Sequence, residues 1–338
     1  MSLSITQTPA LVSLAQSPIM FTVAESTGVY ESSSFQYVGE LYYWTGSLTN
    51  SSSVADYIIT KYPNSQNVGI FDLNRIINST LTELAQADSS SVEYFAVDFY
   101  WQYRDASYQY VTGSHVRSQT YKALDGYGIF QEPIGQEVYN KTPHWPIMSD
   151  GPVTQSAFTT NYGQMGVYVG DAGTAIADRV VYTSATQTAE ISISGGSSSN
   201  QQIVRIPIGP AESGFPLSGS IDSYKIQAGD ALQLLGTPIT FLVECNQKYP
   251  NIRIKWKNRY GQFDWMNFNM INRQSFSTER KTYQPQLGSW EGTSFSYNDY
   301  NSANLAYIVD SKQNITVNSN WLPETYNDCL LYTSPSPR

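Results

Sequence analysis

The stretch SVEYFAVDFYWQYRD, residues 91–105, decides the fold class of this 338-residue chain. Apolar and polar side chains alternate along it, and it is rich in aromatic and β-branched residues, as expected of a strand with one buried face. The next stretch, YQYVTGSHVRSQTYKALDG at 108–126, has the same character and is the expected pairing partner. The sequence therefore predicts a sheet in this part of the chain.

Short segments of the same kind recur along the chain, separated by turn-forming residues. The expected further strands are 19–26, 34–46, 165–171, 177–195 and 201–210. The chain contains 26 Tyr, and charged residues make up 14% of it, where about 25% is usual. A hydrophobic content of 41% is enough for real cores. We therefore expect a mainly β protein with two β-sandwich-like or β-rich α+β domains and one or two short helices.

One segment departs from the strand pattern. In NVGIFDLNRIINSTLTELAQ, residues 67–86, apolar side chains recur at positions i, i+3, i+4, i+8 and i+11, which form one face of a helix. These residues are Leu73, Ile76, Ile77, Leu81 and Leu84. Asp72 stands just before them and is a natural N-cap. We expect an amphipathic helix near 72–86.

A chain of this length favours two domains over one. Residues 1–208 form a β-rich N-terminal region, 209–222 a Gly-, Pro- and Ser-containing linker, and 223–328 a second β-rich domain. Four prolines make 131–160 a loop-rich crossing, which leaves open a break of the N-terminal region into two subdomains.

The last ten residues, CLLYTSPSPR at 329–338, resemble the translation of an adapter used in sequencing libraries. The alternative is an ordinary Pro- and Ser-rich tail. On the first interpretation the source is an assembled environmental fragment, native sequence stops at Asp328, and the second domain is truncated at its C-terminus. Cys245 is then the sole native cysteine, which leaves no intrachain disulfide and no zinc site.

The charge balance bears on the partners. A net charge of −9 opposes general nucleic-acid binding, which needs a basic surface. No apolar run approaches the roughly 18 residues of a membrane span, so we expect no membrane insertion. The N-terminus lacks the basic segment of a signal peptide, so we expect no classical export.

Signatures of catalysis are weak. The two histidines, His115 and His144, have no metal-ligating residues at close spacing in the sequence. A P-loop, a G-x-G-x-x-G motif and a nucleophile elbow are all missing from the sequence. We therefore expect no enzyme activity, catalytic residue, metal or cofactor. A pair of carboxylates for glycoside cleavage stays open, because it leaves little local signature. The acids near aromatic residues are Asp98, Asp105, Glu132 and Glu137.

Basic residues gather in NIRIKWKNRYGQFDWMNFN, residues 251–269. Four cations alternate with apolar residues and are expected on one face of a strand: Arg253, Lys255, Lys257 and Arg259. The intervening Ile252, Ile254 and Trp256 then face a core, and FDWMNF (263–268) pairs back as a hairpin after a turn.

Three interpretations of this basic stripe are open. It is a solvated edge strand that lysine protects from unwanted pairing, or an assembly interface for an acidic partner surface. The third is nucleic-acid binding with Trp265 or Phe268 as stacking platforms, which the acidic balance of the whole chain opposes.

Aromatic residues gather in two other expected strands, FQYVGELYYWTG (35–46) and VDFYWQYRDASYQY (97–110). Exposed rings of this kind stack on sugars, whereas buried ones pack in cores and on sheet faces. The candidate glycan platforms are Tyr42, Tyr43, Trp44, Tyr100, Trp101 and Tyr103.

Two motifs carry a resemblance. W-K-N-R-Y-G-x-F-D (256–264), followed by I-T-V-N-S-N-W-L-P-E (315–324), is similar to a pattern in structural proteins of uncultured tailed bacteriophages. Residues 17–84 also resemble such virion proteins, so the resemblance covers about half of the chain. It implies a virion component, of the tail or baseplate rather than the capsid, and it carries over no catalytic residue.

The expected function is therefore that of a phage virion structural protein, a tail or baseplate component that acts through protein–protein assembly. Its expected partners are other virion proteins and further copies of itself, and its place is the virion, assembled in the host cytoplasm. The alternative is a carbohydrate-binding, receptor-recognition module of a phage tail or bacterial surface protein, whose partner is a bacterial surface glycan.

Overall fold

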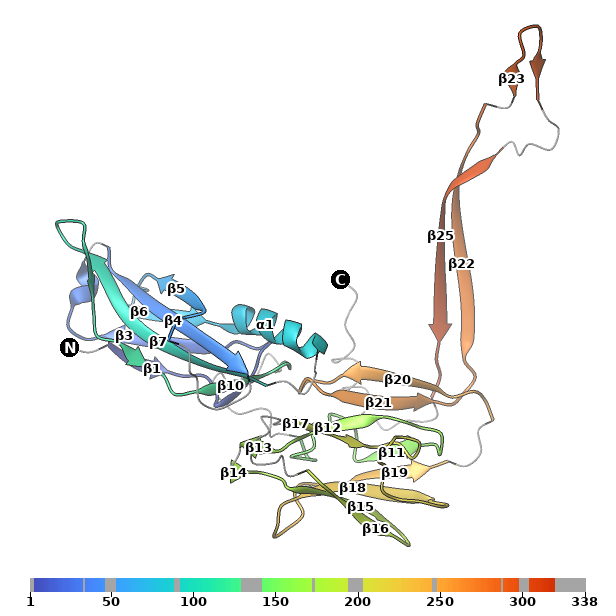
Figure 1. The fold of residues 1–338 in the computed structure, drawn as a ribbon, viewed down its shortest axis with the longest axis horizontal. Helices are drawn as coiled ribbons and strands as arrows, with labels where there is room; N and C mark the ends of the chain where they lie inside the picture. Colours follow the sequence, from blue (N-terminus) through green and yellow to red (C-terminus); the bar gives the residue numbers. More distant parts are fainter. Residues whose placement is uncertain are drawn as a thin grey trace. The chain divides into compact units, whose positions relative to one another are not determined.

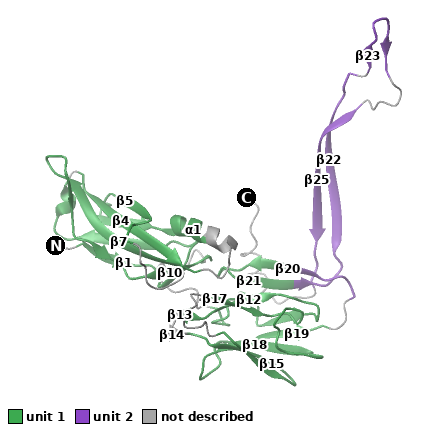
Figure 2. Ribbon diagram, viewed as in Figure 1, with its two compact units in different colours: residues 1–245, 254–266, 323–338 green, residues 246–253, 267–322 purple. Residues whose placement is uncertain are grey.

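A computed structural model describes residues 3–32, 34–45, 53–87, 92–128, 142–171, 174–193, 203–244, 248–286, 288–297 and 304–319. The protein is mainly β, with several sheets and one α-helix among the described residues, so the expected fold class is confirmed. The chain divides into two compact units (Figures 1 and 2). The first unit contains 1–245, 254–266 and 323–338, and the second contains 246–253 and 267–322.

Two sheets pack together in the N-terminal part of the first unit. The smaller, antiparallel sheet consists of β1 (Leu3–Gln7), β3 (Met20–Glu25) and β6 (Val68–Asp72). The larger has the order β2 (Val12–Leu14), β10 (Tyr121–Leu124), β7 (Glu93–Arg104), β4 (Gln36–Thr45) and β5 (Tyr57–Lys61), with β8 (Tyr110–Thr112) and β9 (Val116–Arg117) also paired to β7. A short 3-10 helix, Val29–Glu31, precedes β4.

The core between these two sheets is aromatic. The Phe99 ring of β7 lies with its centroid 5.5 Å from that of Phe21 in β3 and 5.1 Å from that of Phe71 in β6. All three side chains are fully buried. The apolar positions of the alternating stretch that suggested a strand therefore supply one side of a sandwich-like core.

The expected helix is confirmed as α1 (Asn74–Ala87). Its start is fixed by Asp72, whose Oδ1 accepts a hydrogen bond from the backbone N–H of Asn74 at 3.1 Å. Leu73, Ile77 and Leu81 are fully buried in the core between the sheets. The side chain of the fifth predicted residue of this face, Leu84, lies outside the described residues.

A second group of strands completes the first unit. Its main sheet has the order β11 (Thr154–Ala157), β19 (Ile239–Val243), β18 (Ser223–Gly229), β15 (Arg179–Ser184) and β16 (Thr188–Ser192). Three further two-stranded sheets are β12 (Gln164–Tyr168) with β17 (Ile203–Pro207), β13 (Gly170–Asp171) with β14 (Thr174–Ala175), and β20 (Ile252–Lys257) with β21 (Phe263–Phe268). The last pair is the hairpin that the sequence predicted, and residues 254–266 of it belong to the first unit.

The predicted division of the chain differs from the observed one at 209–222. The strands on either side of this segment lie in one system, because β15 and β18 pair directly, from Arg179 opposite Gly229 to Ser184 opposite Tyr224. Leu217 is buried, and the Phe215 ring packs edge-on against the buried Tyr224 ring. The Gly and Pro content suggested a linker, but these two apolar side chains fill a core. The two sheet systems divide instead between β10 and β11, in the region of the expected loop-rich crossing, of which 129–141 lie outside the described residues.

The second unit is built around a long antiparallel hairpin of β22 (Arg273–Tyr283) and β25 (Leu305–Thr316). A shorter pair, β23 (Ser289–Trp290) and β24 (Phe295–Ser296), lies between them in the sequence. Every residue of β22 and β25 is exposed.

Candidate functional site

The face of the larger N-terminal sheet that points away from the core carries a cluster of ionisable side chains. Strands β4 and β7 pair so that Glu40 lies directly opposite Asp98. Side chains alternate along each strand, and the odd-numbered neighbours, such as Leu41 and Phe99, fill the core. Glu40 and Asp98 therefore lie side by side on the opposite face.

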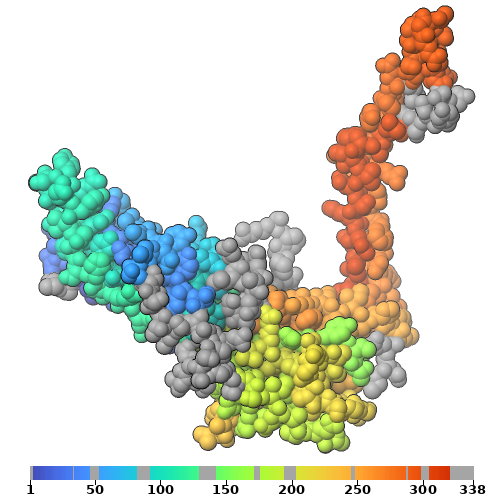
Figure 3. Space-filling model, in the orientation of Figure 1, coloured from blue at the N-terminus to red at the C-terminus, as the bar shows by residue number. Residues whose placement is uncertain are grey.

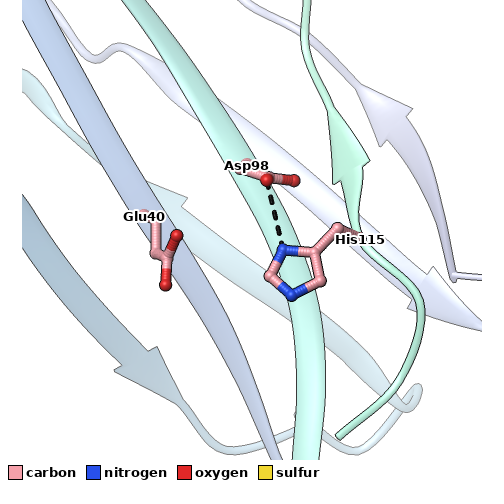
Figure 4. Close-up of side chains that lie close together, drawn as sticks. All are labelled: Glu40, Asp98 and His115. Atoms are coloured by element: carbon pink, nitrogen blue, oxygen red, sulfur yellow. Dashed lines mark hydrogen bonds and ion pairs between the residues drawn. The ribbon is translucent and has the colours of Figure 1, made fainter. Parts of the chain in front are cut away.

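His115 joins these two acids from the segment that leads into β9. Its Nδ1 atom lies 3.1 Å from Oδ2 of Asp98. One donor atom each from Glu40, Asp98 and His115 can be chosen so that all three lie within 4.8 Å of one another (Figure 4). The sequence shows no metal-ligating residues close to His115. The three residues meet because of the register of β4, β7 and β9, which sequence spacing does not reveal.

Aromatic and basic side chains surround this cluster. The Tyr42 hydroxyl lies 3.2 Å from Oε2 of Glu40, and the Arg117 guanidinium lies over the Tyr42 ring, 4.5 Å from its centroid. The Tyr100 ring stacks on the His115 ring at 4.5 Å. Burial, and then the negative charge of Glu40, raises the pKa of both tyrosines, so both hydroxyls keep their protons and can donate to this carboxylate.

The six candidate glycan platforms do not form one surface. Strand alternation places Tyr42, Trp44 and Tyr100 on the outer face, whereas Tyr43, Trp101 and Tyr103 are partly buried against the core. On the outer face, Arg117 covers the Tyr42 ring and His115 covers the Tyr100 ring. Trp44 stacks on Tyr94 with ring centroids 6.1 Å apart. The structure therefore gives these rings neighbours within the protein.

The four predicted basic residues also have different surroundings. Lys257 Nζ forms an ion pair with Asp125 at the end of β10. The backbone N–H of Arg259 donates to Asp150 at 2.9 Å, and Arg253 belongs to the second unit. Of these four side chains, Lys255 is exposed to solvent and the other three are partly buried.

Lys255 borders a cavity of about 350 Å³ in the first unit. Its Nζ lies over the Phe263 ring, 3.7 Å from the centroid, and 5.3 Å from the Trp265 centroid. Partial burial of the ammonium group at the cavity, and then the nearby Arg205 guanidinium, lowers the pKa of Lys255. Two cations share this wall of the cavity, so it favours an anionic ligand. The other lining residues include Tyr162, Gln164, Glu212 and Gln262.

A buried polar network behind the hairpin was missed by the sequence analysis. The Asp264 carboxylate, fully enclosed, accepts hydrogen bonds from Ser149 Oγ at 2.7 Å, from the Asp150 N–H at 2.9 Å and from Asn258 Nδ2 at 3.1 Å. Burial raises its pKa, and burial together with the charge of Asp264 raises the pKa of Asp150 to about 7. The network joins the segment before β11 to the β20–β21 turn.

The motif W-K-N-R-Y-G-x-F-D has a structural basis in this turn. Asn258 Oδ1 accepts from the N–H groups of Tyr260 and Gln262, at 3.1 and 3.0 Å. Gly261 adopts φ +80°, and a Cβ there would lie 2.2 Å from the carbonyl oxygen of Asp125. Asn, Gly and Asp at these positions therefore shape the turn and its contacts, which is a packing role.

Comparison with known proteins adds no family. No protein-family model and no curated protein sequence matches the chain. Among solved structures, the chain is similar to a chimeric titin Z1Z2–Z1Z2 tandem functionalized with a GRGDS peptide from fibronectin, at 11% identity over 72% of this chain and 100% of that one. The TM-score is 0.17, which is too low to carry an argument about fold or function. No helix in the described part of the chain is both long and apolar enough to span a membrane.

Proposed function

We propose that this chain is a structural protein of a phage virion, a tail or baseplate component that acts through assembly. The observation that carries the assembly role is the β22–β25 hairpin of the second unit, coloured orange to red in Figure 3. The assignment to a phage rests on the resemblance of residues 256–264 and 315–324.

The long β22–β25 hairpin is not expected to be stable in water as an isolated two-stranded sheet. Its strands pair from Arg273 opposite Thr316 to Tyr283 opposite Leu305. An isolated hairpin is at best marginally stable in water, and further strands or a packed face are needed for stability. All residues of both strands are exposed in the described part of the structure, which supports a partner as the source of the stabilising surface.

One face of the hairpin is suited to such a partner. In the paired register, alternation places Phe276, Val309 and Ile315 on the same face, where they are 71%, 53% and 47% exposed. The opposite face carries Glu279 across from Asp310, a pairing of like charges. Exposed apolar surface of this kind marks a protein–protein contact site. The partner we propose is a second copy of this chain, in a ring or fibre of identical subunits.

The test measures the mass of the purified chain by light scattering and sedimentation over a range of concentrations. The variant Phe276→Ser, Ile315→Ser makes the apolar face polar, and we expect it to stay monomeric while the unchanged chain assembles. The matched control Ser275→Ala, Asn314→Ser alters the opposite face and should assemble normally. A monomeric unchanged chain, or assembly unaffected by the first variant, would refute self-association through the hairpin.

A second candidate, binding of an acidic glycan, is favoured by the cavity beside Lys255. Lys255 and Arg205 bring positive charge to this cavity, and Phe263, Trp265 and Gln262 also line it. The measurement is an array of bacterial surface saccharides probed with the whole chain. We expect binding to acidic saccharides that Lys255→Gln abolishes, and an array without signal would contradict this candidate.

A further inference from the structure

The pairing of Glu40 with Asp98 is unfavourable as it stands. Like charges directly opposite each other on neighbouring strands repel, and this pair lies in the middle of the β4–β7 ladder. Arg117 is the register partner of Asp98 on its other side, but its guanidinium lies over the Tyr42 ring. In the described part of the chain, Arg117 forms no ion pair with either acid, so a further positive charge between them would relieve their repulsion.

One of the two carboxylate oxygens of Asp98 has no partner among the described residues. Its Oδ2 contacts His115, whereas its Oδ1 is buried and has no hydrogen-bond partner among the described residues. A buried carboxylate oxygen without a partner is costly. A cation that Asp98 binds through both carboxylate oxygens would satisfy Oδ1 and offset the repulsion from Glu40.

The geometry fits two ligands of one metal ion. With metal–ligand bonds of about 2.0–2.2 Å, two neighbouring ligand atoms lie roughly 2.9–3.4 Å apart in tetrahedral or octahedral geometry. The distance from His115 Nδ1 to Asp98 Oδ2 is 3.1 Å. Glu40 presents its carboxylate to the same space from the neighbouring strand (Figure 4).

We propose that Glu40, Asp98 and His115 bind one divalent transition-metal ion, with Zn²⁺ as the best match. Imidazole together with two carboxylates suits zinc, while Ca²⁺ takes six to eight oxygen ligands, more than these side chains supply. The His115 side chain is 51% exposed, so water can complete the coordination. The ion would connect β4, β7 and the segment before β9.

Neighbouring tyrosines hold the ligands in place. The Tyr42 hydroxyl donates to Glu40 Oε2, and the Tyr100 ring fixes the plane of the His115 imidazole by stacking. Such surrounding contacts orient metal ligands and raise affinity. The site therefore has three ligands from three segments and two positioning side chains, which distinguishes it from a chance group of surface acids.

The test uses the whole chain without an affinity tag, stripped with EDTA, dialysed and titrated calorimetrically with ZnCl₂ at neutral pH. We expect one ion per chain. Asp98→Asn and His115→Asn should each weaken binding by about tenfold or more. Glu190→Gln, an acid that pairs with Arg179 elsewhere in the first unit, is the matched control and should bind as the unchanged chain does.

Thermal melting gives a second readout that separates a metal site from a purely structural cluster. Without metal, Asp98→Asn should melt higher than the unchanged chain, because it removes the repulsion from Glu40. With excess Zn²⁺ the order should reverse, because only the unchanged chain gains stability from the bound ion. Equal zinc affinity in all variants, or no zinc binding by the unchanged chain, would overturn the proposal.

Discussion

Replacement of Glu93 by glutamine should make the protein more stable at alkaline pH. Glu93 is fully buried at the start of β7, with its Oε1 and Oε2 atoms 2.9 and 3.0 Å from the Thr80 hydroxyl of α1. Burial raises the pKa of Glu93 to about 8, against a weaker opposing effect of the Thr80 hydrogen bond. At neutral pH the carboxyl group is therefore mostly protonated in the folded protein.

In the protonated form, one chain of hydrogen bonds can link Glu93 to the backbone of α1. The Glu93 O–H can donate to Thr80 Oγ1, and the Thr80 hydroxyl can then donate to the carbonyl oxygen of Ile77 at 3.0 Å. An ionised Glu93 would need the single Thr80 proton for itself, and Thr80 would lose its bond to the helix backbone. Burial thus favours the protonated state of Glu93 and outweighs the hydrogen bond from Thr80, which favours the ionised state.

The effect on stability follows from proton linkage. The folded pKa is about 8 and the ordinary value is 4.5, so the folded protein binds the extra proton between these pH values. Glu93 therefore costs no stability well below pH 4.5, and its cost grows as the pH rises toward 8. At about 1.4 kcal/mol for each tenfold difference in proton affinity, the cost near pH 8 is about 4 kcal/mol.

The assay is urea unfolding followed by the fluorescence of the 7 tryptophans, at pH 5 and at pH 8. Any fixed cost of an amide at this position cancels when the two pH values are compared. The change in unfolding free energy from pH 5 to pH 8 should differ between Glu93→Gln and the unchanged protein by about 3 kcal/mol. Glu190→Gln, at a half-exposed side chain that pairs with Arg179, is the matched control for the change of an acid to an amide. An identical pH profile in Glu93→Gln and the unchanged protein would refute the reasoning.

Other substitutions test the packing of the first unit by the same unfolding assay. Gly261→Ala forces a Cβ into the carbonyl oxygen of Asp125 at φ +80° and should cost about 1–3 kcal/mol; a neutral result would mean that this turn relaxes freely. Asp264→Ala leaves buried donors without an acceptor and should cost about 3 kcal/mol or more, and a smaller loss would show that water replaces the carboxylate. Leu81→Ala opens a cavity under α1 and should cost about 2–5 kcal/mol, unless α1 packs more loosely than its burial indicates. Asp125→Asn should cost about 1–3 kcal/mol, because the Asp125 side chain is only 9% exposed and is paired with the Lys257 ammonium; a smaller loss would mean that this ion pair is screened like a surface pair.

Local sequence patterns predicted the secondary structure well. The apolar residues of α1 and the alternation of 91–105 each report directly on a buried face, so their elements were foreseen. The β20–β21 hairpin was foreseen for the same reason, since Asn258 and Gly261 are turn-forming residues.

Sequence patterns could not predict which distant residues meet. Glu40, Asp98 and His115 come together only through strand register, which depends on the pairing of β4, β7 and β9. Likewise, the sequence predicts that Lys257 is a solvated cation, whereas in the structure it pairs with Asp125, which follows β10. A periodic pattern assigns a side chain to a face, but it does not say what lies across from that face.

The two units bury their apolar residues in opposite ways, which bears on how the second unit is stabilised. In the first unit, side chains such as Phe99 and Tyr182 are fully enclosed, whereas Phe276 and Val309 of the hairpin are mostly open to solvent. Arg280 and Lys281 stand near the C-terminal end of β22, where charge discourages indiscriminate edge pairing. The face that carries Phe276 and Val309 also carries Arg280, so it combines apolar and charged side chains, which suits a specific contact. Its stability should therefore rise with protein concentration, and the amides of 273–283 should exchange with solvent more slowly in the assembled state than in the monomer.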